Sequence, residues 1–564
     1  MDEKTKDACP PELTPTGRQR RRFIKQSMYT AAASTTTAAL VDTIVSPRSR
    51  ALAQSALDWP VHSPPYVSIA PGVGGYGLNT PAGSGRHQAT PNPSIFFVNS
   101  LANTNSGGPA NYGPNTFSGT LEYAIRHAAS PKKIYICVSG YLIEGRGLPI
   151  QTGTPPRPGY VSILGQFAPA PGLFIRGTRL DTNGASNVHV SHLRLYMGDD
   201  PLPGGYTVGG VDAGDNRDCL SSGYGGGVTS NLVFENCEFA FGIDELVDLY
   251  HPHATTSFFQ CAFLDPLHDS DIDHTDDPPD TDHGFGPIIG GGDTAQPDTI
   301  TIFRCLFAHM TARTPLSNCQ RSTMANNVFY NVGDDGIRLI KGSLAAPAPL
   351  YLNSLYNLFV RGPDSRSSLV AIRANTDIPS ASRVYVTGNA AMGGWSASSQ
   401  SAFVTGGPSG YISSSLLTQA IPGSWGSGLS GVLPWFANPA SPSTTEADAI
   451  LDLLERTVGA QPGLANRKGR VPVVLQQIRD RIAGAGSSAS QYIDRVADLG
   501  GWEALGPSVV VDPLNPGTHW HAPFPMGADR NVPYTSGTFS DGTSRVGYTP
   551  LDEFDYEQKL YVMG

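Results

Sequence analysis

Two aspartates separated by three residues are the first feature of this sequence that could do chemistry. Asp244 and Asp248 stand in the segment DELVD. On a straight strand both carboxylates would leave the same face, about 13 Å apart, and they would converge only if the chain turned between them. Asp218 precedes them in the segment NRDCLSS. Three carboxylates from neighbouring segments would suit a hard cation such as Ca²⁺; solvated aspartates at a turn are the alternative.

Arg313, in the segment RTP, is a second candidate, and Pro315 stiffens the turn that holds it. Most arginines lie at the surface or in ion pairs, so a catalytic role for Arg313 is indicated only if the fold brings it close to the aspartates. The elements that position these residues therefore decide the question.

Those elements repeat one short pattern. The segments LVFENCEF, TSFFQCAF, ITIFRCLF and STMANNVF each begin with alternating apolar residues and end with Cys or Asn, one further residue, and Phe. The equivalent residues are Cys237, Cys261, Cys305 and Asn327, at intervals of 24, 44 and 22 residues. A strand-type repeat of about 20–25 residues is typical of a β-solenoid, in which each coil stacks on the last. The interval of 44 is either two periods or one coil with a long loop.

The rest of the chain is divided by composition and periodicity. We expect an extended arm at 54–93, a β-solenoid at 94–442 whose first coil is covered by a helix at 119–128, a helical extension at 443–506 and an irregular tail at 507–564. Within the extension, helices are expected at 443–460, 471–484 and 491–505, the first with Thr444 or Thr445 as its N-cap.

The charge and composition narrow the possible functions. The chain of 564 residues has a net charge of −10 and only 15% charged residues, while Gly (64) and Pro (47) are abundant. Abundant Gly and Pro favour turn-rich β-structure, and the acidic balance argues against a nucleic-acid-binding surface, which needs a basic patch. An acidic protein that acts on an acidic polymer would need a cation between the two.

The first 53 residues are predicted to form a twin-arginine export signal. The segment Arg20–Lys25 reads RRRFIK, a mildly apolar stretch follows at 28–45, and ALA at 51–53 fits a cleavage site. The stretch is too mildly apolar for a lasting membrane anchor. A secreted or periplasmic protein beginning near Gln54 is expected; a basic disordered tail is the alternative.

Six cysteines remain after Cys9 is removed with the signal, and none belongs to a CxxC motif, which argues against a zinc ribbon. An oxidising compartment would allow disulfides. The sequence favours instead a ladder of buried thiols on neighbouring coils.

Taken together, the segments resemble the pectate lyases of the right-handed parallel β-helix type, especially bacterial members with a C-terminal helical extension. The resemblance covers about residues 94–505. Its segments, in chain order, are GTLEYAIRHA, SILGQFAPAPG, NVHVSHLRLYMGD, DCLSS, DELVD, HGFGPIIGG, RTP followed by the pair Asn326-Asn327, and GAQP with GGW.

The resemblance implies an all-β fold, a right-handed parallel β-helix with an N-terminal cap helix and a small C-terminal helical extension. It implies a secreted, monomeric lyase that cleaves a pectate-like uronate polymer, an acidic polysaccharide, by calcium-assisted β-elimination. Asp218, Asp244 and Asp248 would bind Ca²⁺, and Arg313 would remove the proton from C5 of the sugar. A metal on the substrate carboxylate would stabilise the negative charge that develops beside it.

The chain departs from this family in its substrate-binding residues. No lysine occurs between residues 134 and 340, where the family usually has one that holds the substrate carboxylate, and Asn318 replaces the family's second arginine. His283, Arg321 and Arg338 are the expected substitutes.

Three further possibilities stay open. The segment GDDGIRL, with Asp334 and Asp335, is similar to an element of polygalacturonase-like β-helix hydrolases, which use paired carboxylates. A non-catalytic polysaccharide-binding relative is the other alternative. The Asp- and His-rich stretch 264–283 is either a solvated loop or a further calcium site.

Overall fold

The computed structural model describes the following residues: 76, 94–102, 109–113, 116–143, 147–150, 159–200, 207–208, 211–212, 217–222, 229–250, 255–272, 283–290, 298–341, 348–367, 370–422, 429, 431–463, 467–506, 534–539, 542, 544–546, 552, 554–555 and 558. Contacts divide the chain into Met1–Arg50 and Ala51–Gly564. The predicted export signal lies outside the described residues, as does the predicted arm apart from Tyr76.

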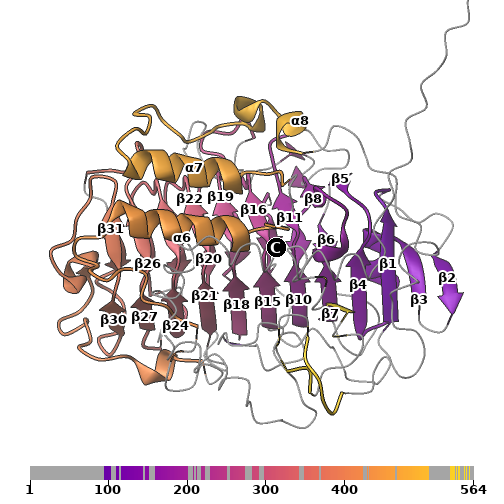
Figure 1. The fold of residues 1–564 in the computed structure, drawn as a ribbon, viewed down its shortest axis with the longest axis horizontal. Helices are drawn as coiled ribbons and strands as arrows, with labels where there is room; N and C mark the ends of the chain where they lie inside the picture. The colour runs from indigo at the N-terminus through magenta and orange to yellow at the C-terminus, as the bar shows by residue number, and fades with distance from the viewer. Residues whose placement is uncertain are drawn as a thin grey trace, which may run out of the picture. The chain divides into compact units, whose positions relative to one another are not determined.

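Three long sheets make up the body of this unit (Figure 1). The first sheet has 12 strands, in the order β2 (Ala110–Gly113), β3 (Thr116–Thr120), β1 (Ser94–Ser100), β4 (Lys132–Ile136), β7 (Gly159–Leu164), β10 (Ser186–Ser191), β15 (Ser230–Glu235), β18 (Thr255–Phe259), β21 (Thr299–Phe303), β24 (Arg321–Ala325), β27 (Tyr351–Leu355) and β30 (Arg383–Thr387). Only β2 pairs antiparallel, with β3; the other neighbours are parallel.

The second and third sheets have nine parallel strands each. The second consists of β5 (Gly140–Ile143), β8 (Leu173–Arg176), β11 (Arg194–Tyr196), β16 (Glu238–Ala240), β19 (Ala262–Leu264), β22 (Leu306–Ala308), β25 (Val328–Tyr330), β28 (Leu358–Val360) and β31 (Ala390–Met392). The third consists of β6 (Leu148–Pro149), β9 (Leu180–Asp181), β14 (Leu220–Ser221), β17 (Val247–Leu249), β20 (Ile288–Ile289), β23 (Leu316–Ser317), β26 (Asp335–Leu339), β29 (Val370–Ala374) and β32 (Val404–Gly406). A small hairpin, β12 (Thr207–Val208) with β13 (Val211–Asp212), stands apart from them.

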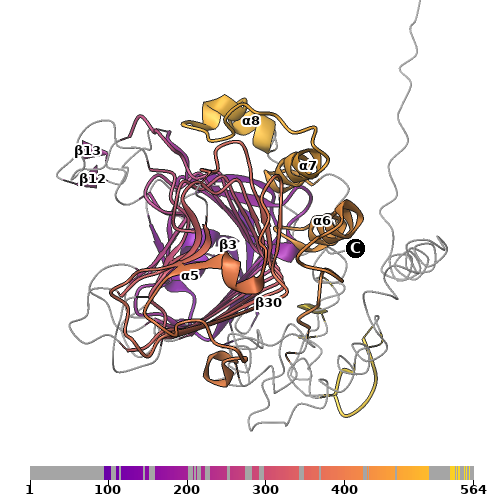
Figure 2. The ribbon, with the colours of Figure 1, turned by 90° about the vertical axis from the view of Figure 1, so that its left-hand side faces the viewer.

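Each coil contributes one strand to each sheet in turn. The chain runs β15, β16, β17, then β18, β19, β20, and each strand pairs with its equivalent one coil away. Viewed from one end, the coils stack behind one another (Figure 2). The fold is a right-handed parallel β-helix, as the sequence predicts.

The turn from the first sheet to the second explains the sequence repeat. From β10 onward it has two residues, and the first has a left-handed backbone in Asn236, Gln260 and Arg304, with φ of 51–53°. The second is the repeated Cys or Asn. The amide of Cys305 donates to Oδ1 of Asn327 at 2.9 Å, so equivalent residues stack. The 44-residue interval is one coil with a long connection, because β18 pairs directly with β21.

The interior of the coil is filled by apolar ladders. The rings of Phe239, Phe263, Phe307, Phe329 and Phe359 stack one above the other, with centroids 4.6–5.2 Å apart. All are buried. The predicted thiol ladder is formed by Cys237, Cys261 and Cys305, which hold the same turn position on neighbouring coils. All six cysteines from Cys137 onward are buried, and among the described residues none forms a disulfide.

Helices lie at one end and along one side of the coil. α5 (Leu121–His127), capped by Thr120, packs on β1 and β3, as predicted for a cap helix. α6 (Thr444–Thr457) and α7 (Val471–Ile482) bury their apolar faces against the second sheet, forming a common core with its outward-facing residues. The predicted third helix is two short pieces, a 3-10 turn at Val496–Leu499 and α8 (Trp502–Leu505).

The N-cap of α6 is Ser443, not Thr444 or Thr445. Its side chain accepts the amide hydrogen of Glu446, whose carboxylate accepts the Ser443 amide in return. This reciprocal capping box needs a Ser or Thr three residues before the Glu, and Ser443 has that spacing.

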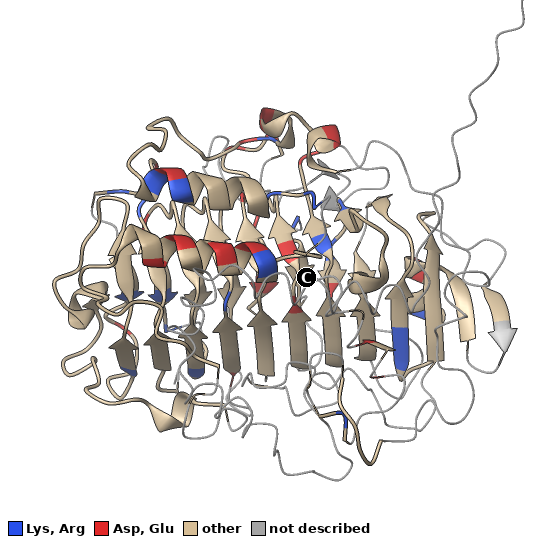
Figure 3. Cartoon of the chain, in the orientation of Figure 1, with Lys and Arg blue, Asp and Glu red and all other residues tan. Residues whose placement is uncertain are grey.

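Buried charges join the helices to the second sheet. Asp265, which follows β19, accepts hydrogen bonds from Arg470 at 2.7 and 3.1 Å, and it lies 2.7 Å from Nδ1 of His309. Burial alone would raise the pKa of the Asp265 carboxyl, but Arg470 and His309 reverse this and hold it well below its usual range. The visible charges of α6 and α7 are marked in Figure 3.

Two segments distant in sequence touch the outer face of the first sheet. The amide of Tyr76 donates to Oγ1 of Thr301 at 3.0 Å. Near the C-terminus, Asp555 pairs with Lys133, and Phe554 stacks on Phe167 at 5.0 Å. No helix in the described part of the chain combines the length and apolarity that crossing a bilayer requires.

Candidate active site

The candidate residues gather where the chain enters the strands of the third sheet. Asp218 precedes β14, Asp244 and Glu245 precede β17, and Arg313 precedes β23. Parallel bridges join Glu245 to Phe285 and Phe285 to Ala312, which extends the ladder of the sheet into these turns. Residues far apart in sequence therefore become neighbours on consecutive coils.

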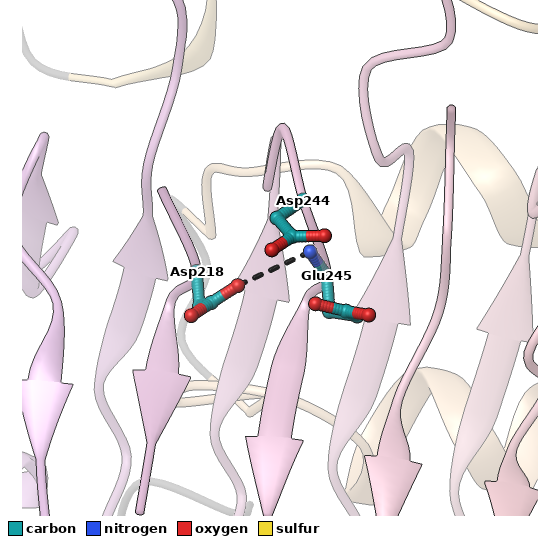
Figure 4. Close-up of side chains that lie close together, drawn as sticks. All are labelled: Asp218, Asp244 and Glu245. Carbon is teal, nitrogen blue, oxygen red and sulfur yellow. Dashed lines mark hydrogen bonds between the residues drawn. The ribbon is translucent and has the colours of Figure 1, made fainter. Parts of the chain in front are cut away.

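Three carboxylates come together at this point (Figure 4). One oxygen each of Asp218, Asp244 and Glu245 lies within 4.8 Å of the others. The backbone amide of Glu245 donates to Oδ1 of Asp218 at 3.2 Å, which links the two coils. Gly242 permits the bend, since a Cβ there would lie 2.3 Å from the carbonyl oxygen of Glu245.

Asp218 is the most deeply buried carboxylate of this group, at 2% exposure. Burial raises its pKa well above the usual range, and the charges of Asp244 and Asp248 raise it further. Arg179 opposes the shift, with Nη1 3.8 Å from Oδ2 of Asp218. The protein alone therefore disfavours the fully ionised group, and a bound cation would favour it.

Asp248 is not part of this group of three. It lies within β17, and its carboxylate accepts hydrogen bonds from the Tyr250 amide at 3.0 Å and from Oγ of Ser221 at 3.4 Å. A turn does separate it from Asp244, which stands outside the strand. Its charge still acts on Asp218, so it belongs to the same electrostatic environment.

Arg313 lies beside the carboxylates. Its guanidinium forms an ion pair with Glu245 and stacks over the ring of Phe285, 4.1 Å from the centroid. A Cβ at Gly286 would lie 2.2 Å from the carbonyl oxygen of Arg313, so the glycine allows the two turns to approach. Glu245 thus links Arg313 to Asp218 and Asp244.

The three expected substrate-binding residues lie in different places. His283 has Nε2 3.8 Å from Oδ1 of Asp244. Arg338 is on β26 of the third sheet, and its amide donates to the carbonyl of Pro315 at 2.9 Å, next to the turn of Arg313. Arg321 begins β24 in the first sheet, beyond the opposite end of the third-sheet strands.

The structure adds three residues that sequence reasoning missed, namely Glu245, Phe285 and Arg179. Glu245 belongs to the segment DELVD, but on a regular strand its side chain would point away from that of Asp244. The bend in the chain before β17 lets both side chains reach the same site. Arg179 has no local signal, because coil register alone places it beside Asp218.

The Asp- and His-rich stretch 264–283 is described only in part, since 273–282 lie outside the described residues. Within it Asp265 is buried in the ion pairs under α7, and Asp271 pairs with Arg495 at 2.6 Å. These two carboxylates therefore have partners in the protein.

The donor set of the site fits a hard cation. Carboxylate oxygens are the ligands that Ca²⁺ prefers, and three lie within reach of one another, one of them buried beside like charges. Thiols and imidazoles, which would favour zinc, are not part of the group of three.

No family model matches the chain, and no curated protein matches it. The chain is similar to a pectate lyase from a Bacillus species in complex with trigalacturonate, at 12% identity over 65% of this chain and 93% of the other, with a TM-score of 0.35. It is also similar to Jun a 1, the major allergen from cedar pollen, at 12% identity over 66% of this chain and 91% of the other, with a TM-score of 0.34. A pectate lyase variant from Xanthomonas campestris is similar at 13% identity over 59% of this chain and 88% of the other, with a TM-score of 0.30. Likenesses this distant transfer no residue role.

Proposed function

We propose that this protein is a polysaccharide lyase that cleaves a pectate-like uronate polymer by β-elimination, with Ca²⁺ as its cofactor. The observation that supports this best is the gathering of Asp218, Asp244 and Glu245 beside Arg313, at the entry to the third sheet. A cation site next to a single arginine is what such an elimination needs.

Asp218 and Asp244 would hold the cation, with Glu245 as a third ligand and Asp248 completing the set. When bound, calcium would supply positive charge against the substrate carboxylate and so stabilise the negative charge that develops on the adjacent carbon. His283, beside Asp244, and Arg338, beside the turn of Arg313, would orient the same carboxylate. Arg321 would contact only a polymer that extends past the far ends of the third-sheet strands.

Arg313 would take the C5 proton at a guanidine nitrogen. The C5–H electron pair forms the C4–C5 double bond, the bond from C4 to the linking oxygen breaks, and that oxygen gains a proton from solvent. An arginine acts as a base only when neutral, and its ordinary pKa lies above about 12. The ion pair with Glu245 favours the charged form, so the base role requires Glu245 to face Asp218 and Asp244 instead.

The positions of Asp334 and Asp335 do not support the alternative function of a hydrolase. Asp334 pairs with Arg366 at 2.5 Å, and Asp335 pairs with Arg373 from within β26. An inverting hydrolase needs two carboxylates that face one bond, one as acid and one as base. A non-catalytic polysaccharide-binding protein would use the same cation site without releasing new chain ends.

We further infer that residues 1–53 direct export by the twin-arginine route and that the mature protein acts as a secreted or periplasmic monomer. The remaining boundaries, 94–442 for the catalytic coil and 443–506 for the helical extension, belong to the same proposal. An exported form that retained Met1 would contradict it, and N-terminal sequencing would reveal this.

The decisive experiment is the ultraviolet absorbance of unsaturated product from polygalacturonate with Ca²⁺. We expect a rise for the wild type, none for Arg313→Ala and none with chelator. Arg366→Ala, which removes an exposed paired arginine two coils away, is the matched control and should behave as wild type. New reducing ends without a rise in absorbance would mean hydrolysis instead. If no new chain ends form, the protein binds the polysaccharide without cleaving it.

A further inference from the structure

The outward-facing residues of the third sheet form a continuous row across its strands. The register pairs Asp248 with Ile288, Ile288 with Leu316, Leu316 with Arg338, and Arg338 with Arg373. Neighbouring strands lie about 4.8 Å apart, so the row crosses the sheet in regular steps.

The two arginines point away from the interior. Successive side chains on a strand alternate between faces. The residues on either side of each arginine belong to the buried core: Ile337, Leu339, Ile372 and Ala374. Arg338 and Arg373 are both partly exposed, on the face opposite to that core.

Charge changes sign along this row. The carboxylates of the candidate cation site lie at the β14 and β17 end, two apolar side chains follow at Ile288 and Leu316, and the arginines of β26 and β29 come next. Arg338 therefore lies one strand beyond the turn of Arg313, and Arg373 lies two strands beyond it. A polymer lying across the strands from the cation site would meet them in that order.

The arginines differ in how the protein holds them. Asp335, itself buried, accepts from Nε of Arg373 and fixes the guanidinium, while 40% of that side chain stays exposed. Arg338 forms no ion pair with any described residue, and its side chain is partly exposed. The exposed part of the Arg338 guanidinium could therefore pair with an incoming anion.

We propose that Arg338 and Arg373 form a binding track for the carboxylates of two neighbouring sugars, so that the protein takes runs of contiguous uronates. Guanidinium groups bind carboxylates through paired hydrogen bonds. The step between adjacent strands is comparable with the length of one sugar in an extended chain. Polymers in which uronates alternate with neutral sugars would leave one arginine without a partner. The inference deepens the proposed function and rests on it for the position of the polymer.

The test is the binding of hexagalacturonate, measured by calorimetry in an Arg313→Ala background so that turnover does not intervene. Arg338→Gln and Arg373→Gln should each weaken binding about tenfold, the loss expected for a charge-assisted contact. The matched control is Arg383→Gln, which removes the same charge from a partly exposed arginine at the start of β30 in the first sheet. It should leave binding unchanged. A hyaluronan oligosaccharide of equal length, in which uronates alternate with neutral sugars, should bind at least tenfold more weakly than hexagalacturonate.

The outcomes separate the track from the chemistry. If Arg373→Gln changes affinity no more than Arg383→Gln does, the track is wrong, whatever the wild type does to the polymer. Equal affinity for hyaluronan and galacturonate fragments would overturn the preference for contiguous uronates. Weakened binding in both track variants, with no unsaturated product from wild type, would uphold the track and refute the elimination. Unchanged thermal unfolding of each variant shows that folding is not the cause.

Discussion

Glu245 has two possible partners, and replacing it should reveal both. It pairs with Arg313, and its carboxylate also belongs to the group formed with Asp218 and Asp244. Glu245→Gln removes one negative charge from that group and releases Arg313 from its ion pair. The side chain keeps its size, so packing is little disturbed.

The magnitude follows from the distances. Two unit charges 4.8 Å apart, the span of this group, interact by about 3 kcal/mol at an effective dielectric constant of about 20. A cation at that distance from Glu245 would lose attraction of this size in the variant, so loss of Glu245 should weaken calcium binding about a hundredfold. Arg313→Ala should act oppositely and strengthen calcium binding, because it removes a repelling charge and frees Glu245. Since the Arg313 side chain is 28% exposed, solvent screening limits this gain to about fivefold, or about 1 kcal/mol.

Calorimetric titration with Ca²⁺ measures both effects without any substrate. In a Glu245→Gln background, Arg313→Ala should strengthen calcium binding less than it does in the wild type, because no Glu245 carboxylate is left to be freed. Asp334→Asn and Arg366→Ala break an ion pair whose members lie one and two coils beyond Arg313, and they serve as controls. The reasoning fails if Glu245→Gln binds calcium as tightly as Asp334→Asn does, or if Arg313→Ala weakens binding.

Two further predictions concern stability. Asp265→Asn should cost about 3–5 kcal/mol near neutral pH, because it leaves Arg470 buried without its counter-charge. The lowered pKa of Asp265 means that its contribution is complete above about pH 4 and is lost as pH falls through the folded-state pKa, so the variant should show a flatter acid limb in denaturant titrations between about pH 5 and pH 2. Phe307→Ala, at the middle of the aromatic ladder, should destabilise by about 3–5 kcal/mol; a loss below about 1 kcal/mol in urea unfolding would show that the ladder repacks.

The fold could be predicted because its repeat is local. The second residue of each first-sheet turn, as in Cys237 and Cys261, is selected by a small buried space that recurs on every coil. The Phe two residues later is selected by the aromatic ladder inside the coil. These constraints depend only on neighbours one coil away, so they appear in the sequence as a period.

The site was harder to predict from the sequence, because the chain is irregular there. Asp218 and Asp244 were found through their motifs, but the pairing of Glu245 with Arg313 depends on a bend that breaks strand alternation. Arg179 and Arg373 join their partners only through register, over intervals that vary with the length of each loop. Such contacts leave no periodic trace, so coordinates are needed to find them.

The two-residue turns between the first and second sheets have a consequence for the evolution of this chain. From β10 to β31 those turns never lengthen, whereas the connections before and after the third-sheet strands range widely; the connection from β19 to β20, for example, spans residues 265–287. Insertions are thus tolerated only beside the sheet that holds the carboxylates and the arginine row. New ligand preferences could arise there by exchange of loops while the stacked ladders stay in register, and the same positions are the natural sites for grafting a designed binding loop.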